Sequence, residues 1–123
     1  MEPVRFGVIS TAKIGLERVI PAMLQGQHTA IHAIASRDLA KAKAAAEQFG
    51  IPKAYGSYDE LLADDEIEAV YNPLPNHLHV PLSIQAAEAG KHVLCEKPIA
   101  LDAREASTLI DARDRAGVVI AEA

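Results

Sequence analysis

The sequence predicts an α/β fold in which helices cover both faces of a doubly wound, all-parallel sheet. Three observations predict it. Short apolar runs alternate with helix-like stretches along the 123 residues. The run at residues 67–71 is nearly all apolar, as in a strand buried on both faces. Residues 4–15 pass from an apolar run through small residues into a helical pattern, which is typical of a dinucleotide-binding unit. Right-handed crossovers then favour the strand order 3-2-1-4-5-6.

The first half of the chain alternates strand and helix. Residues 4–9 predict the first strand and residues 13–25 the first helix, with a kink at Pro21 because its nitrogen cannot bond the Glu17 carbonyl. Residues 29–35 predict the second strand, and residues 36–38 cap an Ala- and Lys-rich helix that ends at Gly50. Residues 52–55 predict a short third strand, and a small helix follows at residues 59–63.

The second half continues the alternation. Residues 67–71 predict the fourth strand, and two prolines make residues 72–76 a loop. A helix is expected over residues 77–89 and the fifth strand over residues 92–95. Asp102 caps a long helix to residue 116, and residues 118–121 predict the sixth strand. Because no repeat or linker interrupts the pattern, residues 1–123 are predicted to be one domain.

Composition limits the class of function. Apolar residues make up 50% of the chain and the net charge is −5. Without a basic stripe or a long apolar run, neither a nucleic-acid nor a membrane partner is expected. No metal site is predicted. The start of the chain shows no signal peptide and Cys95 is the single cysteine, so a reducing, cytoplasmic location is predicted.

Residues 10–15 form the predicted phosphate-binding turn. They read Ser-Thr-Ala-Lys-Ile-Gly against the dinucleotide pattern G-x-G-x-x-G, so only Gly15 keeps a glycine of the pattern. Ala12 is small enough for close backbone approach, whereas Ser10 is accepted easily only in a turn without positive φ. An ordinary strand–helix connection would also suit these residues, so the surrounding sequence has to distinguish it from a phosphate-binding turn.

Ligands in such a sheet bind beyond the carboxyl ends of the strands, and unusual residues gather there. Ser36 and Arg37 follow the second strand, at the place where NAD-binding proteins carry an acid. A guanidinium there suits the 2′-phosphate of NADP. The alternative is that Ser36 or Asp38 only caps the next helix and that Arg37 is solvated.

Two later segments belong to the same predicted edge. The rigid loop at residues 72–77 could line the nicotinamide side of a cofactor, or serve as a helix entry with Asn76 as N-cap, and both can hold. His79 is a candidate lining residue, although a lone helical histidine is usually structural.

Glu96-Lys97 is a charged pair that directly follows a buried strand. Such a pair suits a cleft, where a lysine can hydrogen-bond a substrate oxygen. The alternative is a surface salt bridge.

Residues 90–98, Gly-Lys-His-Val-Leu-Cys-Glu-Lys-Pro, resemble the G-K-H-V-x-x-E-K-P signature of the Gfo/Idh/MocA oxidoreductases, the glucose–fructose oxidoreductase and inositol dehydrogenase family. Residues 71–79 resemble the loop of that family, and residues 35–38 resemble the second-strand end common among its NADP-using members. The turn at residues 10–12 is similar to that of the branch with dihydrodiol and xylose dehydrogenases.

The resemblance spans the chain and implies an oxidoreductase that uses NADP, with NAD also possible. It would transfer hydride between nicotinamide and a sugar, polyol or related hydroxyl or carbonyl substrate. Lys97 would be the catalytic lysine and Glu96 its orienting neighbour. The cofactor-binding residues that the resemblance implies are Ser10, Thr11, Ala12, Ile14, Ser36, Arg37, Pro73, Leu74, Asn76, His79, Glu96 and Lys97.

Members of that family also carry a second α+β domain that walls the substrate pocket and often pairs subunits. The resemblance therefore implies that residues 1–123 are the N-terminal NAD(P)-binding domain, with the second domain absent from this chain. The parent enzyme would be a homo-oligomer, and this chain alone is expected to bind dinucleotide without turnover. Two alternatives stay open: a non-catalytic nucleotide-binding sensor or regulatory domain, which would not need Lys97, and a structural module without ligand.

Overall fold

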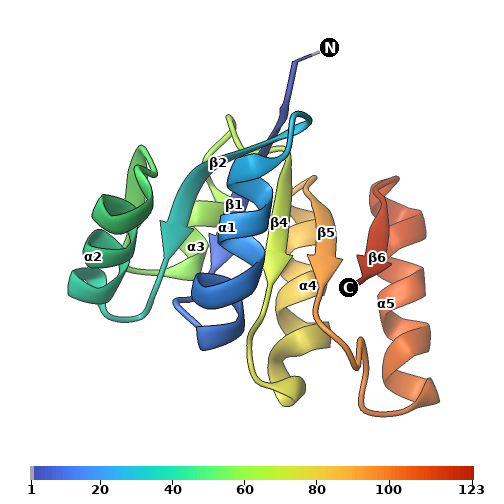
Figure 1. Ribbon diagram of the computed structural model, residues 1–123. Coiled ribbons are helices and arrows are strands. Elements are labelled where there is room, and N and C mark those ends of the chain that lie inside the picture. Colours follow the sequence, from blue (N-terminus) through green and yellow to red (C-terminus); the bar gives the residue numbers. More distant parts are fainter. Residues whose placement is uncertain (1) are drawn as a thin grey trace.

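A computed structural model describes residues 2–123 and contains one six-stranded parallel sheet. The strands lie side by side in the order β3-β2-β1-β4-β5-β6, which confirms the predicted order (Figure 1). Their bounds are Val4–Ile9 for β1, Thr29–Ala35 for β2, Lys53–Tyr55 for β3, Ala69–Asn72 for β4, His92–Cys95 for β5 and Ile120–Glu122 for β6.

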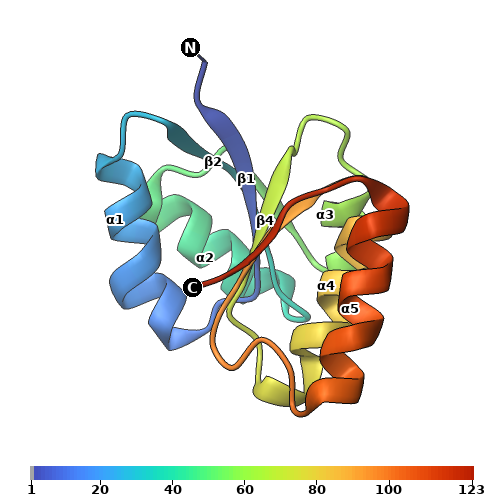
Figure 2. The same ribbon diagram turned by 90° about the vertical axis from the view of Figure 1, so that its right-hand side faces the viewer.

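Helices cover both faces of this sheet (Figure 2). On one face lie a π-helical turn, η1 (Gly15–Val19), its continuation α1 (Ile20–Gln25), and α2 (Leu39–Phe49). On the other lie α3 (Tyr58–Leu62), α4 (His79–Glu88) and α5 (Ala103–Ala116), and a 3₁₀ turn, η2 (Asn76–Leu78), leads into α4. Among residues 2–123, no helix is long and apolar enough to cross a membrane.

The two faces of the sheet carry separate apolar cores. Val8 and Ile9 are adjacent on β1, yet Val8 packs with α1 and α2 while Ile9 packs with α3 and α4. Val70 and Tyr71 divide between the two cores in the same way. Side chains of a strand alternate between faces, so a sheet covered on both sides needs apolar residues at consecutive positions. This is why the strands read as nearly continuous apolar runs.

The first helix is irregular directly before Pro21. Residues 13–25 are helical as expected, but Gly15–Val19 form a π-helical turn in which the Ile20 N–H donates to the Gly15 carbonyl oxygen. In a regular α-helix the ring of Pro21 would collide with the carbonyl oxygen four residues earlier. The irregularity expected at Pro21 therefore takes the form of a wider turn directly before it.

The predicted N-cap at Asn76 is wrong. The chain enters this helix through η2, and no side-chain hydrogen bond caps η2 or α4. The Leu78 N–H donates instead to the Pro75 carbonyl oxygen at 2.9 Å, so the backbone already satisfies a donor that an Asn76 cap would have served. Other boundaries move by no more than two residues: β4 begins at Ala69 and β6 at Ile120.

Candidate functional site

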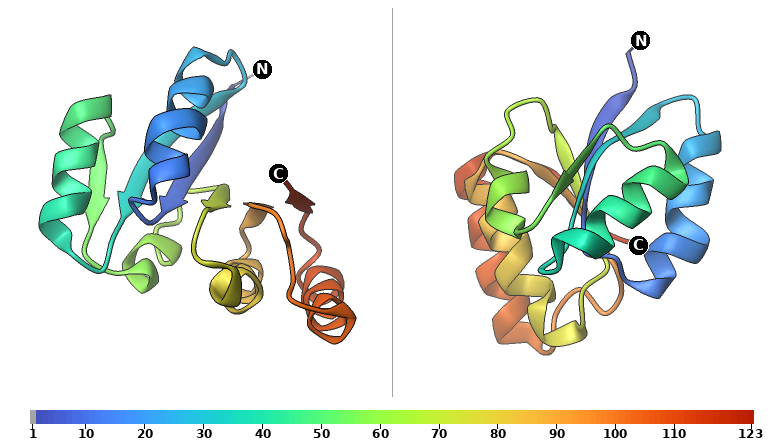
Figure 3. Two further views of the ribbon diagram at one scale, coloured as in Figure 1. Left: turned by 60° about the horizontal axis from the view of Figure 1, so that its bottom comes forward. Right: turned by 90° about the vertical axis from the view of Figure 1, so that its left-hand side faces the viewer.

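The carboxyl ends of the strands surround a hollow of about 290 Å³. Figure 3, left, brings this edge of the sheet forward. We call this space the nucleotide hollow. It is lined by segments that follow β1, β2 and β4 and by the starts of α2 and α3. Its lining residues are Ser10, Thr11, Ala12, Ser36, Arg37, Asp38, Lys41, Tyr58, Leu74 and Pro75.

Ser10 opens the turn after β1 with a φ of 104°. The turn therefore places Ser10 at positive φ, in the conformation that a serine does not accept easily. The Ser10 N–H donates to the Ala35 carbonyl oxygen at 2.8 Å, and its Oγ accepts from the Ala12 N–H at 3.2 Å. The chain leaves β1 and enters a helix within three residues, a reversal for which this position ordinarily carries glycine. The two hydrogen bonds hold a serine in that conformation.

Gly15 lets the start of the helix lie against the sheet. A Cβ atom at this position would lie 3.4 Å from Cε2 of Tyr71 and 3.7 Å from Cγ of Pro73. The Leu16 N–H donates to the Ala12 carbonyl oxygen at 3.0 Å, and the N–H groups before it belong to the open first turn of the helix. Small residues beside such a helix start fit the pyrophosphate of a dinucleotide.

A second group of residues lines the hollow at the end of β2. Ser36 is buried; its N–H donates to the Tyr55 carbonyl oxygen at 3.1 Å, and its Oγ accepts from the Asp38 N–H at 3.1 Å. Asp38 caps α2, because its Oδ1 accepts from the Ala40 N–H at 3.0 Å. The predicted alternative of a capping residue thus holds for Asp38, and its carboxylate is engaged with the helix.

Arg37 and Lys41 give this end of the hollow a positive charge. Both are exposed, both line the hollow, and neither has an ion-pair partner within residues 2–123. Lys41 was not predicted from the sequence, because Arg37 precedes the N-cap Asp38 and only the packing of α2 beside the hollow brings Lys41 to it. Tyr58 was also missed, because only the tertiary structure brings the start of α3 to the hollow.

The loop after β4 is built on Asn72, which is fully buried. Its Nδ2 donates to the His79 carbonyl oxygen at 3.1 Å and to Ser83 Oγ at 3.2 Å, and its Oδ1 accepts from the Leu74 N–H at 3.1 Å. These bonds give the two-proline loop one conformation. As a result Leu74, also buried, lines the nucleotide hollow together with Pro75.

His79 is only 1% exposed, and both nitrogens of its ring are engaged. Nδ1 lies 2.6 Å from the Pro98 carbonyl oxygen and Nε2 lies 2.6 Å from the Leu74 carbonyl oxygen. Carbonyl oxygens only accept, so a neutral ring can donate to one of them and a doubly protonated ring to both. The ring therefore ties the loop after β4 to the turn after β5 and has no nitrogen left for a ligand.

Glu96 and Lys97 follow β5 but are not paired with each other. Glu96 Oε1 accepts from Tyr71 Oη at 2.9 Å, and the Glu96 N–H donates to the Asn72 carbonyl oxygen at 3.0 Å. Lys97 is exposed, and within residues 2–123 its side chain has no hydrogen bond or ion pair. The alternative of a surface salt bridge between the two is therefore not found. The Lys97-Pro98 peptide bond is cis.

The structure brings six of the predicted cofactor-binding residues to the hollow: Ser10, Thr11, Ala12, Ser36, Arg37 and Leu74. The other six do not line it: Ile14, Pro73, Asn76, His79, Glu96 and Lys97. Of these, Glu96 is joined to β4 through Tyr71, and His79 is joined to Leu74 and Pro98. That these six residues take part in cofactor binding remains a prediction. In the described part of the chain, no group of three or more His, Cys, Asp or Glu side chains could hold a metal ion.

Known proteins resemble this chain along its whole length. An uncharacterized oxidoreductase of Rhizobium meliloti is 66% identical over 123 residues, which are 100% of this chain and 37% of that protein. A D-xylose 1-dehydrogenase (NADP+) of Haloferax volcanii is 52% identical over 96% of this chain and 36% of its own length. The chain thus spans little more than a third of these relatives.

Solved structures agree with the sequence comparison. A 3-ketoreductase from Actinomadura kijaniata, in complex with TDP-benzene and NADP, matches 98% of this chain with a TM-score of 0.95 and 40% identity. The match covers 38% of that protein. The model of the oxidoreductase family with an NAD-binding Rossmann fold matches residues 4–123. On the strength of this match, together with the parallel sheet and the turn at its carboxyl edge, the chain belongs to the Gfo/Idh/MocA oxidoreductase family.

Proposed function

We propose that residues 1–123 are the nucleotide-binding domain of an NADP-dependent oxidoreductase. The enzyme transfers hydride between nicotinamide and a sugar, polyol or related hydroxyl or carbonyl compound. The observation that carries this proposal is the nucleotide hollow, which has a helix start and small residues on one side. On the other side are two cations that have no ion-pair partner within residues 2–123. The xylose dehydrogenase and the 3-ketoreductase named above support the cofactor and the substrate class.

The two sides of the hollow have different roles in this proposal. Thr11 and Ala12, with the open first turn of the helix, receive the pyrophosphate. Ser36 meets the adenosine ribose, and Arg37 and Lys41 bind its 2′-phosphate through charge-assisted hydrogen bonds. NAD lacks this phosphate, so it gains nothing from the two cations and binds more weakly.

The chemistry lies at the end of β5. A bound nicotinamide supplies or accepts the hydride. Lys97 hydrogen-bonds the substrate oxygen and gives or takes its proton, which favours the alkoxide that forms during hydride transfer. The backbone N–H of Glu96 donates to the Asn72 carbonyl oxygen and so positions the turn that carries this lysine. The loop with Pro73 and Asn76 borders the nicotinamide. His79 holds that loop at a fixed distance from the turn that carries Lys97.

The proposal extends to location and assembly. Cys95 is the single cysteine and is fully buried. Burial raises the pKa of its thiol to about 11, so it stays protonated and unreactive at neutral pH. These properties suit a reducing, cytoplasmic compartment. The parent enzyme would pair its subunits through a second domain, which would also complete the substrate pocket.

Calorimetric titration of the chain with NADP and with NAD tests the proposal. Arg37→Ala removes one charge-assisted bond, worth roughly 1.5–3 kcal/mol, so NADP should bind about tenfold or more weaker. The affinity for NAD should stay within about twofold. Lys43→Ala is the matched control, because it removes an exposed cation of α2 that does not line the hollow. Equal losses for both nucleotides, or no binding of NADP at millimolar concentration, would overturn the proposal.

A further inference from the structure

Tyr71 on β4 contacts both the helix start beside the nucleotide hollow and Glu96, which follows β5. It is fully buried on β4, with its ring beneath the helix start: Cε2 lies 3.4 Å from where a Cβ atom of residue 15 would be. Its Oη donates to Oε1 of Glu96 at 2.9 Å. Burial and the neighbouring carboxylate of Glu96 raise the pKa of Tyr71, so the phenol stays a donor at neutral and alkaline pH.

The hydrogen bond from Tyr71 to Glu96 affects the charges around Lys97. Glu96 is its neighbour in sequence and of opposite charge, yet the carboxylate of Glu96 is held by Tyr71, and Lys97 has no ion pair within residues 2–123. A free carboxylate on the residue next to an exposed lysine would form an ion pair with its ammonium group for part of the time. A paired ammonium group is less available to a substrate oxygen.

We propose that Tyr71 is a positioning residue that keeps the Glu96 carboxylate away from Lys97 and so leaves the Lys97 ammonium group free for a substrate oxygen. The inference rests on the proposed function in one respect, namely that Lys97 is the group that meets the substrate. Tyr71 itself acts only through Glu96. Its hydroxyl therefore matters for Lys97 only while a carboxylate is present at position 96.

The backbone around Lys97 is fixed independently of the Tyr71 hydroxyl. The Glu96 N–H donates to the Asn72 carbonyl oxygen at 3.0 Å, and Nδ1 of His79 lies 2.6 Å from the Pro98 carbonyl oxygen. Tyr71→Phe keeps the buried ring and removes only the hydroxyl. The substitution therefore frees the carboxylate of Glu96 without releasing the chain on either side of Lys97.

Labelling of lysines with isotopically coded acetic anhydride, read by mass spectrometry, tests the inference without any substrate. The rate at Lys97 is compared with the rate at Lys43, an exposed lysine of α2 in the same molecule. In Tyr71→Phe, Lys97 should react about twofold to fivefold more slowly, the range expected for an exposed ion pair. In the double variant Tyr71→Phe/Glu96→Ala, the rate should return to that of the parent, because no carboxylate remains to pair.

Tyr55→Phe is the matched control. It removes another phenol that donates to a carboxylate, that of Asp64 at 2.7 Å, but at the opposite end of the sheet, so the rate at Lys97 should not change. If Tyr71→Phe does not fold, the single variant Glu96→Ala tests the inference. In the parent, Tyr71 already holds the Glu96 carboxylate away from Lys97, so in Glu96→Ala the rate at Lys97 should stay within about twofold of the parent rate.

Three results would contradict the inference: an unchanged rate in Tyr71→Phe, a slow rate that persists in the double variant, or a clearly faster rate in Glu96→Ala. The second would mean that the hydroxyl has only a structural role, since removal of the carboxylate could not rescue it. Titration of the parent with NADPH is run beside the labelling. If the parent chain does not bind NADPH, the proposed function is contradicted but the role of Tyr71 is not. If the labelling rate in Tyr71→Phe is unchanged, the role of Tyr71 is contradicted but the proposed function is not.

Discussion

Ser10 adopts a backbone conformation that residues other than glycine rarely take, with a φ of 104°. Such strain costs on the order of 1–3 kcal/mol and persists where the surroundings hold it. Here the surroundings are the hydrogen bond to Ala35 on β2 and the bond from the Ala12 N–H to Ser10 Oγ. A serine in place of glycine thus adds one bond within the turn at the expense of backbone strain.

Substitution at Ser10 separates these two effects. Ser10→Ala keeps the strain and loses the bond to Ala12, so the free energy of unfolding should fall by about 0.5–1.5 kcal/mol. Ser10→Gly loses the same bond, and the greater freedom of glycine in the unfolded chain lowers the free energy of unfolding by roughly 0.5–1 kcal/mol. The substitution also removes the backbone strain, which raises the free energy of unfolding. Urea unfolding should therefore rank Gly above Ala by about 1 kcal/mol. If Ala were instead the more stable variant by about 0.5–1 kcal/mol, the entropy cost of glycine alone would explain the difference, and position 10 would store no strain.

At the scale of elements, side-chain caps decide where three helices begin. Asp38, Ser57 and Asp102 each accept a hydrogen bond from a backbone N–H in the first turn of α2, α3 and α5. Gly50 and Gly117 end α2 and α5 in the left-handed conformation, with φ of 67° and 68°. Because cap and cap partner lie within a few residues, these helix ends could be predicted from the sequence.

The cap of α5 offers a clear test. Asp102 Oδ1 accepts from the Glu105 N–H at 2.8 Å, so Asp102→Ala should lower the free energy of unfolding by about 1 kcal/mol. Asp111→Ala is the control, since it removes an exposed carboxylate from the middle of the same helix and should change stability by less than about 0.5 kcal/mol. Guanidinium unfolding of both variants measures the difference. Equal losses would mean that α5 does not depend on its cap.

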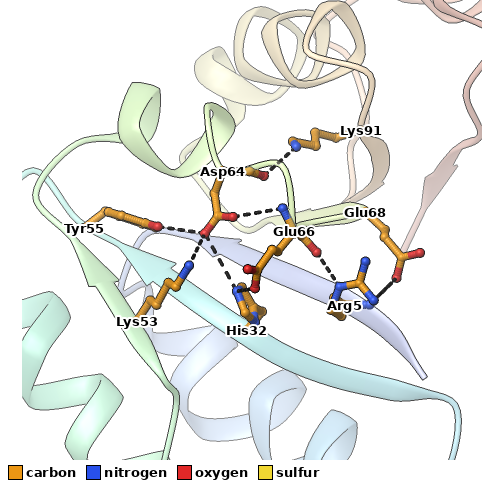
Figure 4. Close-up of polar contacts among 8 residues, drawn as sticks. All are labelled: Arg5, His32, Lys53, Tyr55, Asp64, Glu66, Glu68 and Lys91. Carbon is orange, nitrogen blue, oxygen red and sulfur yellow. Dashed lines mark hydrogen bonds and ion pairs between the residues drawn. The ribbon is translucent and has the colours of Figure 1, made fainter. Parts of the chain in front are cut away.

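At the scale of the whole molecule, a second group of charged residues lies at the other end of the sheet, centred on Asp64 (Figure 4). Its side chain, 6% exposed, accepts from Tyr55 Oη at 2.7 Å, from Lys53 Nζ at 3.3 Å and from the Glu66 N–H at 2.9 Å. Nε2 of His32 lies 3.8 Å from the same carboxylate. Burial alone would raise the pKa of Asp64, but these hydrogen bonds outweigh it and lower the pKa to about 2.

The lowered pKa predicts how stability depends on pH. The folded state holds the ionised form of Asp64 more strongly than the unfolded state, whose carboxyl titrates near 3.8. The stabilisation is therefore complete above about pH 5 and is lost as the pH falls toward 2. Asp64→Asn should be less stable than the parent at pH 6, and the difference should shrink between pH 5 and pH 2. Denaturant unfolding across this range measures it, with Asp111→Asn, which removes an exposed carboxylate of α5, as the control.

Periodicity and contacts within a few residues are enough to predict the order of the elements, the parallel sheet and the capped ends of α2 and α5. The sequence also pointed to Arg37, Glu96 and Lys97, since strand ends in such a sheet face one edge. Contacts between distant segments, in contrast, arise only when the chain folds. Lys41 and Tyr58 line the hollow because α2 and α3 begin beside it.

The hydrogen bond from Tyr71 to Glu96 joins residues 25 positions apart, and the ring of His79 joins two loops. The φ of Ser10 likewise depends on its bond to β2. Each of these depends on how strands align and how closely helices pack, so many distant residues determine them together. Local sequence carries no signal for such contacts, and this is why the partners of the candidate catalytic pair became known only from the folded chain.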